Sequence, residues 1–150
     1  MAEQASDKRH DLDRELIELL NELRVALPGV QVLFAFLLAV PFANGWTRVT
    51  DLQRDVFFVA FIATAAASIL LIAPSAHHRL LWREGNKENM LRTANTLAIA
   101  GTVFLAIGMT AAVFLIADIL FRAWWAALTT ALVAGGFAWF WYGLPLLRRR

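Results

Sequence analysis

Four long stretches without a charged residue dominate the hydrophobic pattern of this chain. They are the runs Val25–Thr47, Val56–Ala76, Thr93–Ala117 and Ala123–Leu147. Each run is long enough to cross the ~30 Å hydrocarbon layer of a bilayer as an α-helix, which rises ~1.5 Å per residue. The pattern therefore predicts an all-α, polytopic membrane protein with four transmembrane helices.

The segment before the first run has an amphipathic pattern. Its leucines recur at spacings of three or four residues, and an acidic residue directly precedes four of them. These residues are Leu12, Leu16, Leu19, Leu23 and Leu27, with Asp11, Glu15, Glu18 and Glu22. The pattern predicts a helix that leads into the first span. We expect this helix to lie on the lipid headgroups or under the bundle, with an oligomerising coiled coil as the alternative.

Prolines predict where the first helix changes course. Pro28, next to Gly29, removes one backbone donor, so we expect a bend or break where the amphipathic helix meets the membrane. Pro41 predicts the end of the first span or a kink near it. The chain thus divides into a cytoplasmic amphipathic helix over 1–24, a four-helix transmembrane domain over 25–147 and a basic cytoplasmic tail over 148–150.

Small residues predict which spans pack together. The second span carries Ala60, Ala63, Thr64, Ala67 and Ser68, and the third carries Ala94, Ala98, Gly101, Gly108, Ala111 and Ala112. Small side chains let helix backbones approach closely where lipid supplies no hydrophobic drive. We therefore expect these two faces to meet, and the short turn around Asp118–Arg122 to make the third and fourth spans an antiparallel hairpin.

The basic residues predict the orientation. Of the 14, 11 fall on one side of the four runs: Lys8, Arg9, Arg14, Arg24, Arg79, Arg83, Lys87, Arg92 and Arg148–Arg150. Only Arg48, Arg54 and Arg122 fall on the other side. Cytoplasmic loops are enriched in Lys and Arg, so we expect both termini in the cytoplasm and the protein in the inner (plasma) membrane of a bacterium.

Composition excludes several kinds of chemistry. Hydrophobic residues make up 59% of the chain, and cysteine is absent, which excludes disulfides and thiolate nucleophiles. The net charge is +2, and most of the basic residues lie beside the membrane. We therefore expect anionic lipid headgroups as partners and no nucleic acid. No nucleophile motif surrounds Ser68 or Ser75, so we expect neither an enzyme nor a bound cofactor or metal.

Gln31 is the most unusual polar residue, since an amide about two turns into a span must find partners. It can make an interhelical hydrogen bond, for example to Thr64, Ser68 or a carbonyl released by Pro28, or it can line a transport path. Candidates for such a path are Gln31, Thr64, Ser68 and Asp118, with Glu15, Glu18 and Glu22 near its inner mouth. In a monomer these glutamates are a solvated face.

Two further groups of ionisable residues have alternative interpretations. Asp118 can couple proton movement, although an ion pair with Arg122 four residues later fits its position at the end of a span better. His77 and His78 point roughly 100° apart on a helix, so they cannot form a same-face metal pair. With Arg79 and Arg83 they are candidates for headgroup contacts or for pH sensing.

Two segments carry a resemblance to a known family. The first joins Glu22-Leu23-Arg24-Val25 to Gly29–Leu38 and Pro41-Phe42, and the second joins Leu71-Ile72-Ala73-Pro74 to His78-Arg79. The chain resembles small bacterial four-span membrane proteins of unknown function. Relatives often have Thr where this chain has Pro28. Some carry a sodium–proton antiporter label, which the resemblance implies without naming any catalytic residue.

The sequence favours one function and keeps a second open. The first is passage of a small cation or proton through a homo-oligomer. The alternative is a non-transporting adaptor or scaffold that binds a protein or anionic lipid through its cytoplasmic helix and loop. No Asp, Glu, Lys, Arg or His lies in the middle of any run, which argues against antiport.

The topology can be tested by thiol labelling, because the chain has no cysteine of its own. Single cysteines at Ser6 and Asn86 should be protected from an impermeant reagent in intact cells, whereas one at Asp51 should react. External labelling at Ser6 or Asn86 would refute the predicted orientation.

Overall fold

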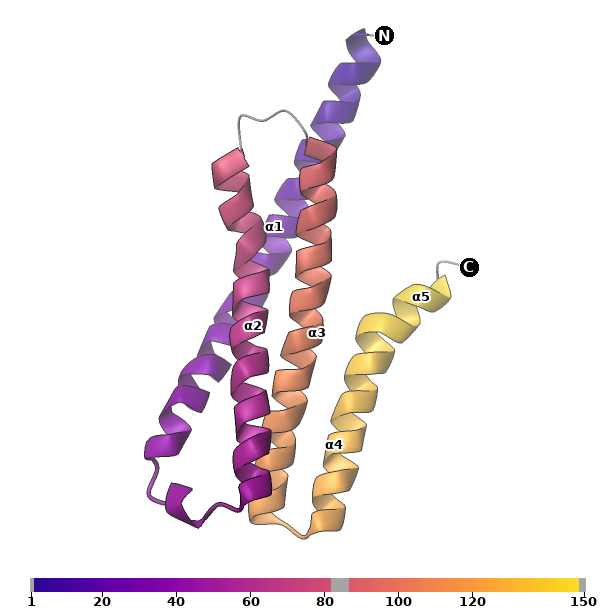
Figure 1. Ribbon diagram of the computed structural model, residues 1–150. Coiled ribbons are helices and arrows are strands. Elements are labelled where there is room, and N and C mark those ends of the chain that lie inside the picture. The colour runs from indigo at the N-terminus through magenta and orange to yellow at the C-terminus, as the bar shows by residue number, and fades with distance from the viewer. Residues whose placement is uncertain (1, 82–86, 149–150) are drawn as a thin grey trace. The chain divides into compact units, whose positions relative to one another are not determined.

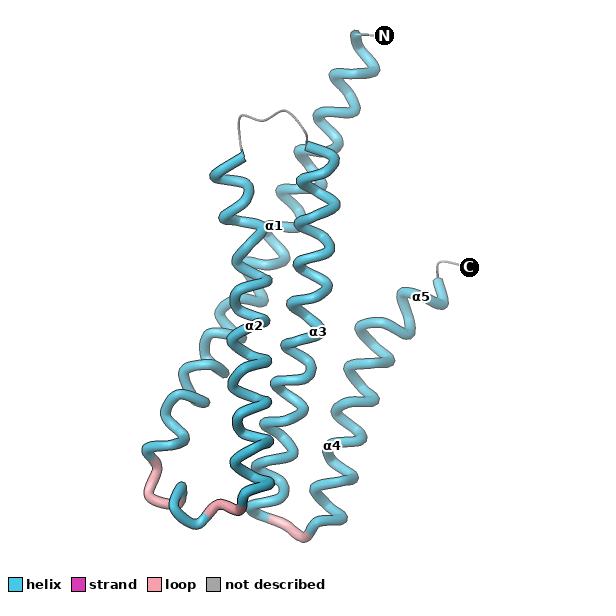
Figure 2. Tube along the Cα trace, in the orientation of Figure 1, coloured by secondary structure: helices cyan, strands magenta, loops and turns pink. Residues whose placement is uncertain are grey.

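The computed structural model describes the backbone of residues 2–81 and 87–148 and the side chains of residues 10–77 and 88–147. Its elements are all helical (Figures 1 and 2): α1 Ala2–Ala39, η1 Val40–Phe42, η2 Trp46–Arg48, α2 Asp51–Leu81, α3 Lys87–Leu120, α4 Ala123–Phe137, η3 Ala138–Gly143 and α5 Leu144–Arg148. Four segments are long and apolar enough to cross a membrane: His10–Phe42, Asp51–His77, Glu88–Leu120 and Ala123–Leu147. The predicted all-α, four-span architecture is confirmed.

Helix α1 corrects two expectations. It continues through Pro28 without a break, and its buried residues Leu16, Leu23, Val30 and Leu37 recur every seven positions on one face. Pro28 is exposed, so its ring points away from the packed face. One lost backbone bond does not end a helix that has buried residues on both sides of it, here Leu23 and Val30. The predicted break is therefore wrong, and the helix over 1–24 continues into the first span instead of forming a separate element. Pro41 lies in η1, directly after α1 ends, as predicted.

Contacts divide the chain into two compact units, Met1–Val32 with Ala66–Val103 and Leu33–Ala65 with Phe104–Arg150. In the first unit the buried side chains are Leu16, Leu23 and Val30 of α1, Ala67, Leu71 and Pro74 of α2, and Ala94 of α3. Gly101 faces α2 so closely that an added Cβ would lie 2.7 Å from the Leu71 side chain. Of the leucine stripe of α1, Leu16 and Leu23 are thus buried within their own chain and Leu12, Leu19 and Leu27 are half-buried, which favours packing within the chain over an oligomerising coiled coil.

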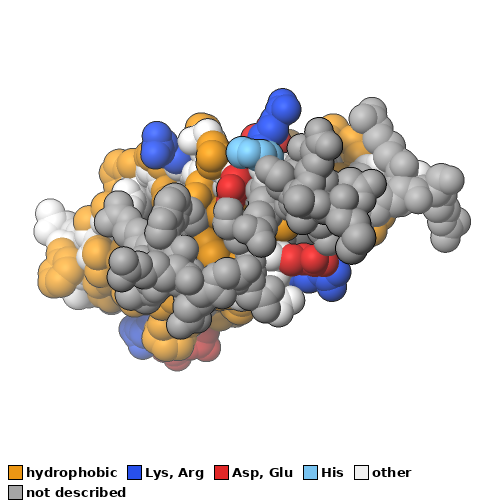
Figure 3. All heavy atoms as spheres, turned by 90° about the horizontal axis from the view of Figure 1, so that it is seen from above, with side chains coloured by type: hydrophobic (Ala, Val, Ile, Leu, Met, Phe, Trp, Pro, Cys, Tyr) orange, Lys and Arg blue, Asp and Glu red, His pale blue; other side chains and the backbone are white. Residues whose placement is uncertain are grey.

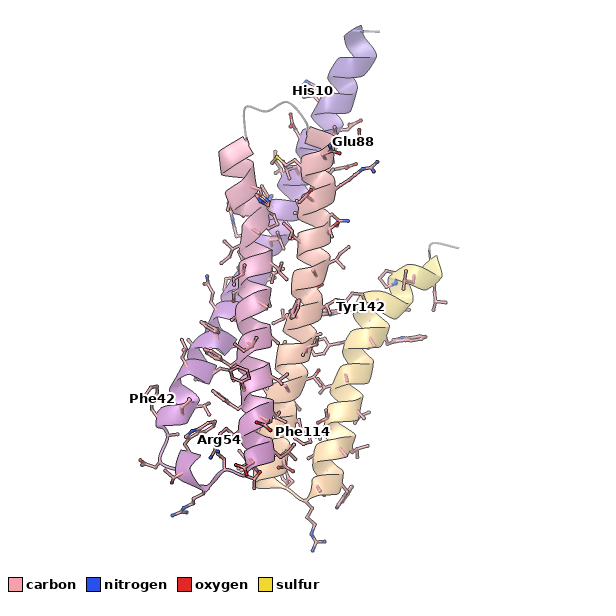
Figure 4. All side chains as sticks on the ribbon, in the orientation of Figure 1. His10, Phe42, Arg54, Glu88, Phe114 and Tyr142 are labelled. Atoms are coloured by element: carbon pink, nitrogen blue, oxygen red, sulfur yellow. The ribbon has the colours of Figure 1, made fainter. Side chains whose placement is uncertain are left out.

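The second unit has a core of apolar and aromatic side chains. Leu37, Phe57, Ala60 and Leu115 form its centre. The ring of Trp46 packs edge-on against Phe57 at 4.7 Å between centroids, which anchors the turn after α1 to α2. Phe114, on the neighbouring part of α3, is labelled in Figure 4.

In the second unit, α2 and α3 approach each other closely at Gly108. A Cβ there would lie 2.5 Å from Thr64 Oγ1 and 3.3 Å from the carbonyl oxygen of Ala60. This confirms that the small-residue faces of the second and third spans meet at Gly108, whereas Gly101 packs against the larger Leu71.

The fourth span differs from the other three in how little of it is buried. Ala126 is the buried residue of α4, whose exposed side chains are mainly apolar. The helix then widens into a π-helical turn, η3, in which the Leu144 N–H donates to the carbonyl of Trp139. Phe137 and Trp141 pack edge-on across the start of this turn, with centroids 4.7 Å apart.

Glycine-to-alanine substitutions test the helix contact. Gly108→Ala should be about 1–3 kcal/mol less stable than Gly135→Ala, because only the former forces a methyl group against backbone and a hydroxyl. Gly135 is a matched control, since it also lies inside a helix and nothing lies within 4 Å of its Cβ position. Gly101→Ala should fall between them, because the Leu71 side chain can move. Thermal unfolding in detergent measures the order, and equal stability of all three would show that the contact is misplaced.

Candidate functional site

Helix α1 has two exposed polar faces on either side of its buried stripe. The acidic face consists of Asp11, Glu15, Glu18 and Glu22, all of them exposed. Within it, Glu18 accepts a bond from exposed Arg14 at 3.2 Å. Viewed from above (Figure 3), red and blue charged side chains lie among orange hydrophobic ones on the described surface. The acidic face is therefore open to solvent or to a partner.

The Gln31 face of α1 consists of Asn21, Arg24, Pro28 and Gln31, which are also all exposed. Their spacing of three, four and three residues keeps them in one line along the helix. Gln31 lies seven residues beyond Arg24, the last charge before the span, and so about 10 Å further along the axis. Pro28 has no N–H for the carbonyl of Arg24, which adds an unpaired acceptor between them. This face carries polar groups from the membrane surface into the span.

The two faces do not form one path. Gln31 follows Val30, which is fully buried, and so points about 100° away from the packed stripe. Of the two interpretations of Gln31, an interhelical hydrogen bond within the chain and a lining of a transport path, its exposed position does not support the first. Nine residues separate Gln31 from Glu22, which places their side chains about 180° apart around α1. The candidate pathway residues of α1 thus lie on opposite sides of it.

Thr64 and Ser68 have structural surroundings. Thr64 is fully buried, and its hydroxyl donates to the carbonyl of Ala60 at 2.7 Å while facing Gly108. This bond satisfies the hydroxyl within its own helix. Ser68 is half-buried and also has an interaction partner.

Asp118 belongs to a polar link that the sequence analysis missed. Gln53 Nε2 donates to Asp118 Oδ2 at 2.9 Å, in a partly buried position that joins α2 to α3. Gln53 also closes a capping box with Thr50: the Thr50 N–H donates to Gln53 Oε1 at 3.0 Å, and the Gln53 N–H donates to Thr50 Oγ1 at 3.2 Å. The Thr-x-x-Gln pattern before the second span indicates a capping box, and this pattern could have identified Gln53 from the sequence.

The expected ion pair between Asp118 and Arg122 is not formed among the described side chains. The ion pairs among these side chains join Arg14 to Glu18, Arg54 to Asp51 and Arg92 to Glu88. Helix α3 ends at Leu120, and Arg122 is the N-cap of α4, so the two residues do not share one helix. Asp118 also lies about 15 Å along α3 from Gly108, against which Thr64 packs. These two pathway candidates are not brought together.

The structure describes only part of the group formed by His77, His78, Arg79 and Arg83. His77 is half-buried, whereas the side chains of His78 and Arg79 and the whole of Arg83 lie outside the described residues. Within the described part of the chain, no group of three or more His, Asp or Glu side chains is placed to hold a metal ion.

A double-mutant cycle measures the link between α2 and α3. Gln53→Ala and Asp118→Ala should each lower thermal stability, with a coupling of about 1 kcal/mol between them, because they remove the two ends of one hydrogen bond. Thr50→Ala is the matched control: it breaks only the cap, so its effect should add to that of Asp118→Ala. Additivity of Gln53→Ala with Asp118→Ala would mean that their bond contributes nothing to stability.

Comparison with known proteins gives one match. The model of a family of unknown function, DUF6328, matches residues 5–145. No curated protein and no solved structure matches the chain. The family match runs from the start of α1 to the end of the fourth span, and it agrees with the resemblance carried by the two sequence segments. The chain, a membrane-type helical protein, belongs to DUF6328, a family of unknown function.

Proposed function

We propose that this protein is a non-transporting membrane scaffold that presents α1 to a partner on the cytoplasmic side. The observation that carries the proposal is its apolar interior. Among the described residues, Thr64 is the only buried side chain that is polar or charged, and its hydroxyl is bonded within its own helix. Passage of an ion requires polar groups around a hydrated axis, whereas a scaffold requires only a dry bundle.

The length of α1 supports a presenting role. Its 38 residues span about 57 Å, roughly twice the thickness of the hydrocarbon layer. Within the first unit, the turns around His10 extend past the beginning of α3 near Glu88 (Figure 4). In the orientation that the basic residues predict, this part of α1 stands in the cytoplasm.

The acidic face indicates the chemistry of the partner. Asp11, Glu15, Glu18 and Glu22 point away from the buried stripe and repel anionic lipid headgroups. A protein segment rich in Lys or Arg fits this face better than a lipid surface. The partner we propose is therefore a basic protein segment.

Cation or proton passage is the second candidate, and Gln31 is the observation that favours it. Because this amide is exposed at membrane depth, it can line a hydrated axis only if several copies of the chain turn their Gln31 faces inward. Sodium–proton antiport, which the resemblance implies, would in addition need an ionisable group deep in the membrane.

Proteoliposomes distinguish the two candidates. The reconstituted protein should carry no Na⁺ or proton current above that of protein-free vesicles between about pH 5 and pH 8. Gln31→Leu should leave this background unchanged. A current that disappears in Gln31→Leu would overturn the scaffold and establish passage.

Photo-crosslinking in intact cells tests the presented face. A photoreactive residue at Glu18 should give adducts with another protein, whereas one at exposed Arg122, beyond the other end of α3, should not give the same adducts. Neutralising the neighbours with Glu15→Gln and Glu22→Gln should reduce the adducts at Glu18. Adducts that are indifferent to these charges, or none at all, would contradict recognition through the acidic face.

A further inference from the structure

We infer that the Gln31 face of α1 is a self-association surface on which a second copy of this chain docks, with the two Gln31 carboxamides hydrogen-bonded across a two-fold axis. This inference does not depend on the scaffold function, since it rests on the Gln31 face within the membrane and not on the acidic face that the scaffold presents.

The starting observation is a polar amide in apolar surroundings. Gln31 is exposed, and the exposed side chains of Val32 and Phe36, which follow it on α1, are apolar. At about 10 Å beyond Arg24 it lies within the hydrocarbon layer. A carboxamide has two donor hydrogens and an acceptor oxygen, and lipid chains satisfy none of them. The exposed amide therefore needs a partner from outside the chain.

A second copy meets this need most directly. Two copies inserted in the same direction place their Gln31 residues at the same depth, and a two-fold axis normal to the membrane brings them face to face. Because a carboxamide both donates and accepts, the two can form a reciprocal pair. The carbonyl of Arg24, which Pro28 leaves without its helical donor, is a further acceptor on the same face.

The neighbouring residues favour contact at Gln31 itself. Ala35 continues the Gln31 face one turn deeper; it is exposed and small, so it allows the two helices to approach. Arg24 lies two turns away at headgroup level, where water and phosphate groups screen its repulsion from the second Arg24. The contact is therefore centred on Gln31 and Ala35.

Cysteine crosslinking tests the surface, because the chain has no native cysteine. Ala35→Cys lies on the Gln31 face. Gly29→Cys is the matched control: it is also exposed, has nothing within 4 Å of its Cβ position, and points about 160° away from Gln31 at nearly the same depth. In native membranes, Ala35→Cys should give a crosslinked dimer and Gly29→Cys little or none.

Substitutions of Gln31 test whether dimerisation depends on its carboxamide. In the Ala35→Cys background, Gln31→Leu should weaken dimerisation between about 3-fold and about 30-fold, as expected for interhelical hydrogen bonds, while Gln31→Asn should retain most of it. Helix content and thermal stability of the monomer should not change, because Gln31 makes no contact that the monomer needs.

Several results would overturn the inference: equal crosslinking at residues 29 and 35, no dimer, a dimer indifferent to Gln31→Leu, or crosslinked species larger than a dimer. If Gln31→Leu does not fold, the comparison of Ala35→Cys with Gly29→Cys decides alone. The liposome currents report separately on function, so failure of the dimer and failure of the scaffold can be told apart.

Discussion

The need to pair every polar group inside a bilayer determines where the polar side chains of this protein lie. Thr64, the polar side chain buried deepest in the described residues, bonds the carbonyl of Ala60 in its own helix. Gln53 and Asp118 pair with each other where α2 begins and α3 approaches its end. Gln31 is the exception, since it sits at membrane depth on an outward face. The same constraint that makes the interior dry thus makes this one amide informative.

Close packing between α2 and α3 follows from the same environment. Helices gain no hydrophobic energy by leaving lipid, so they associate through van der Waals contact, which is strongest where glycine lets backbones approach. Gly108 meets Thr64 and the backbone of Ala60, whereas Gly101 meets the Leu71 side chain. The Thr64 hydroxyl fits opposite Gly108 only because it turns back onto its own helix. The Thr64 side chain therefore takes part both in the packing against Gly108 and in the hydrogen bond to Ala60.

Sequence reasoning predicted the spans and the small-residue contact because both depend on local properties, namely long apolar runs and the positions of glycine and alanine. It failed at Pro28, because the effect of a missing donor depends on how firmly the rest of the helix is held, which is a property of packing. The prediction of an ion pair between Asp118 and Arg122 was wrong because it assumed one continuous helix, whereas α3 ends between the two residues. Gln53 was overlooked, although its capping pattern with Thr50 is present in the sequence.

The exposure of Gln31 was in principle predictable. The buried residues Leu16, Leu23, Val30 and Leu37 follow a strict seven-residue spacing, and any residue directly after one of them must point to the side. Once α1 is understood as one unbroken helix, the acids and Gln31 fall on opposite flanks of the packed stripe. A single copy then cannot use both for one path, but the proposed scaffold can use them for two contacts: one outside the membrane through charge, and one within it through an amide. This separation of two exposed faces along one continuous helix is compatible with the proposed scaffold, and it follows from the helical period and the position of the buried stripe.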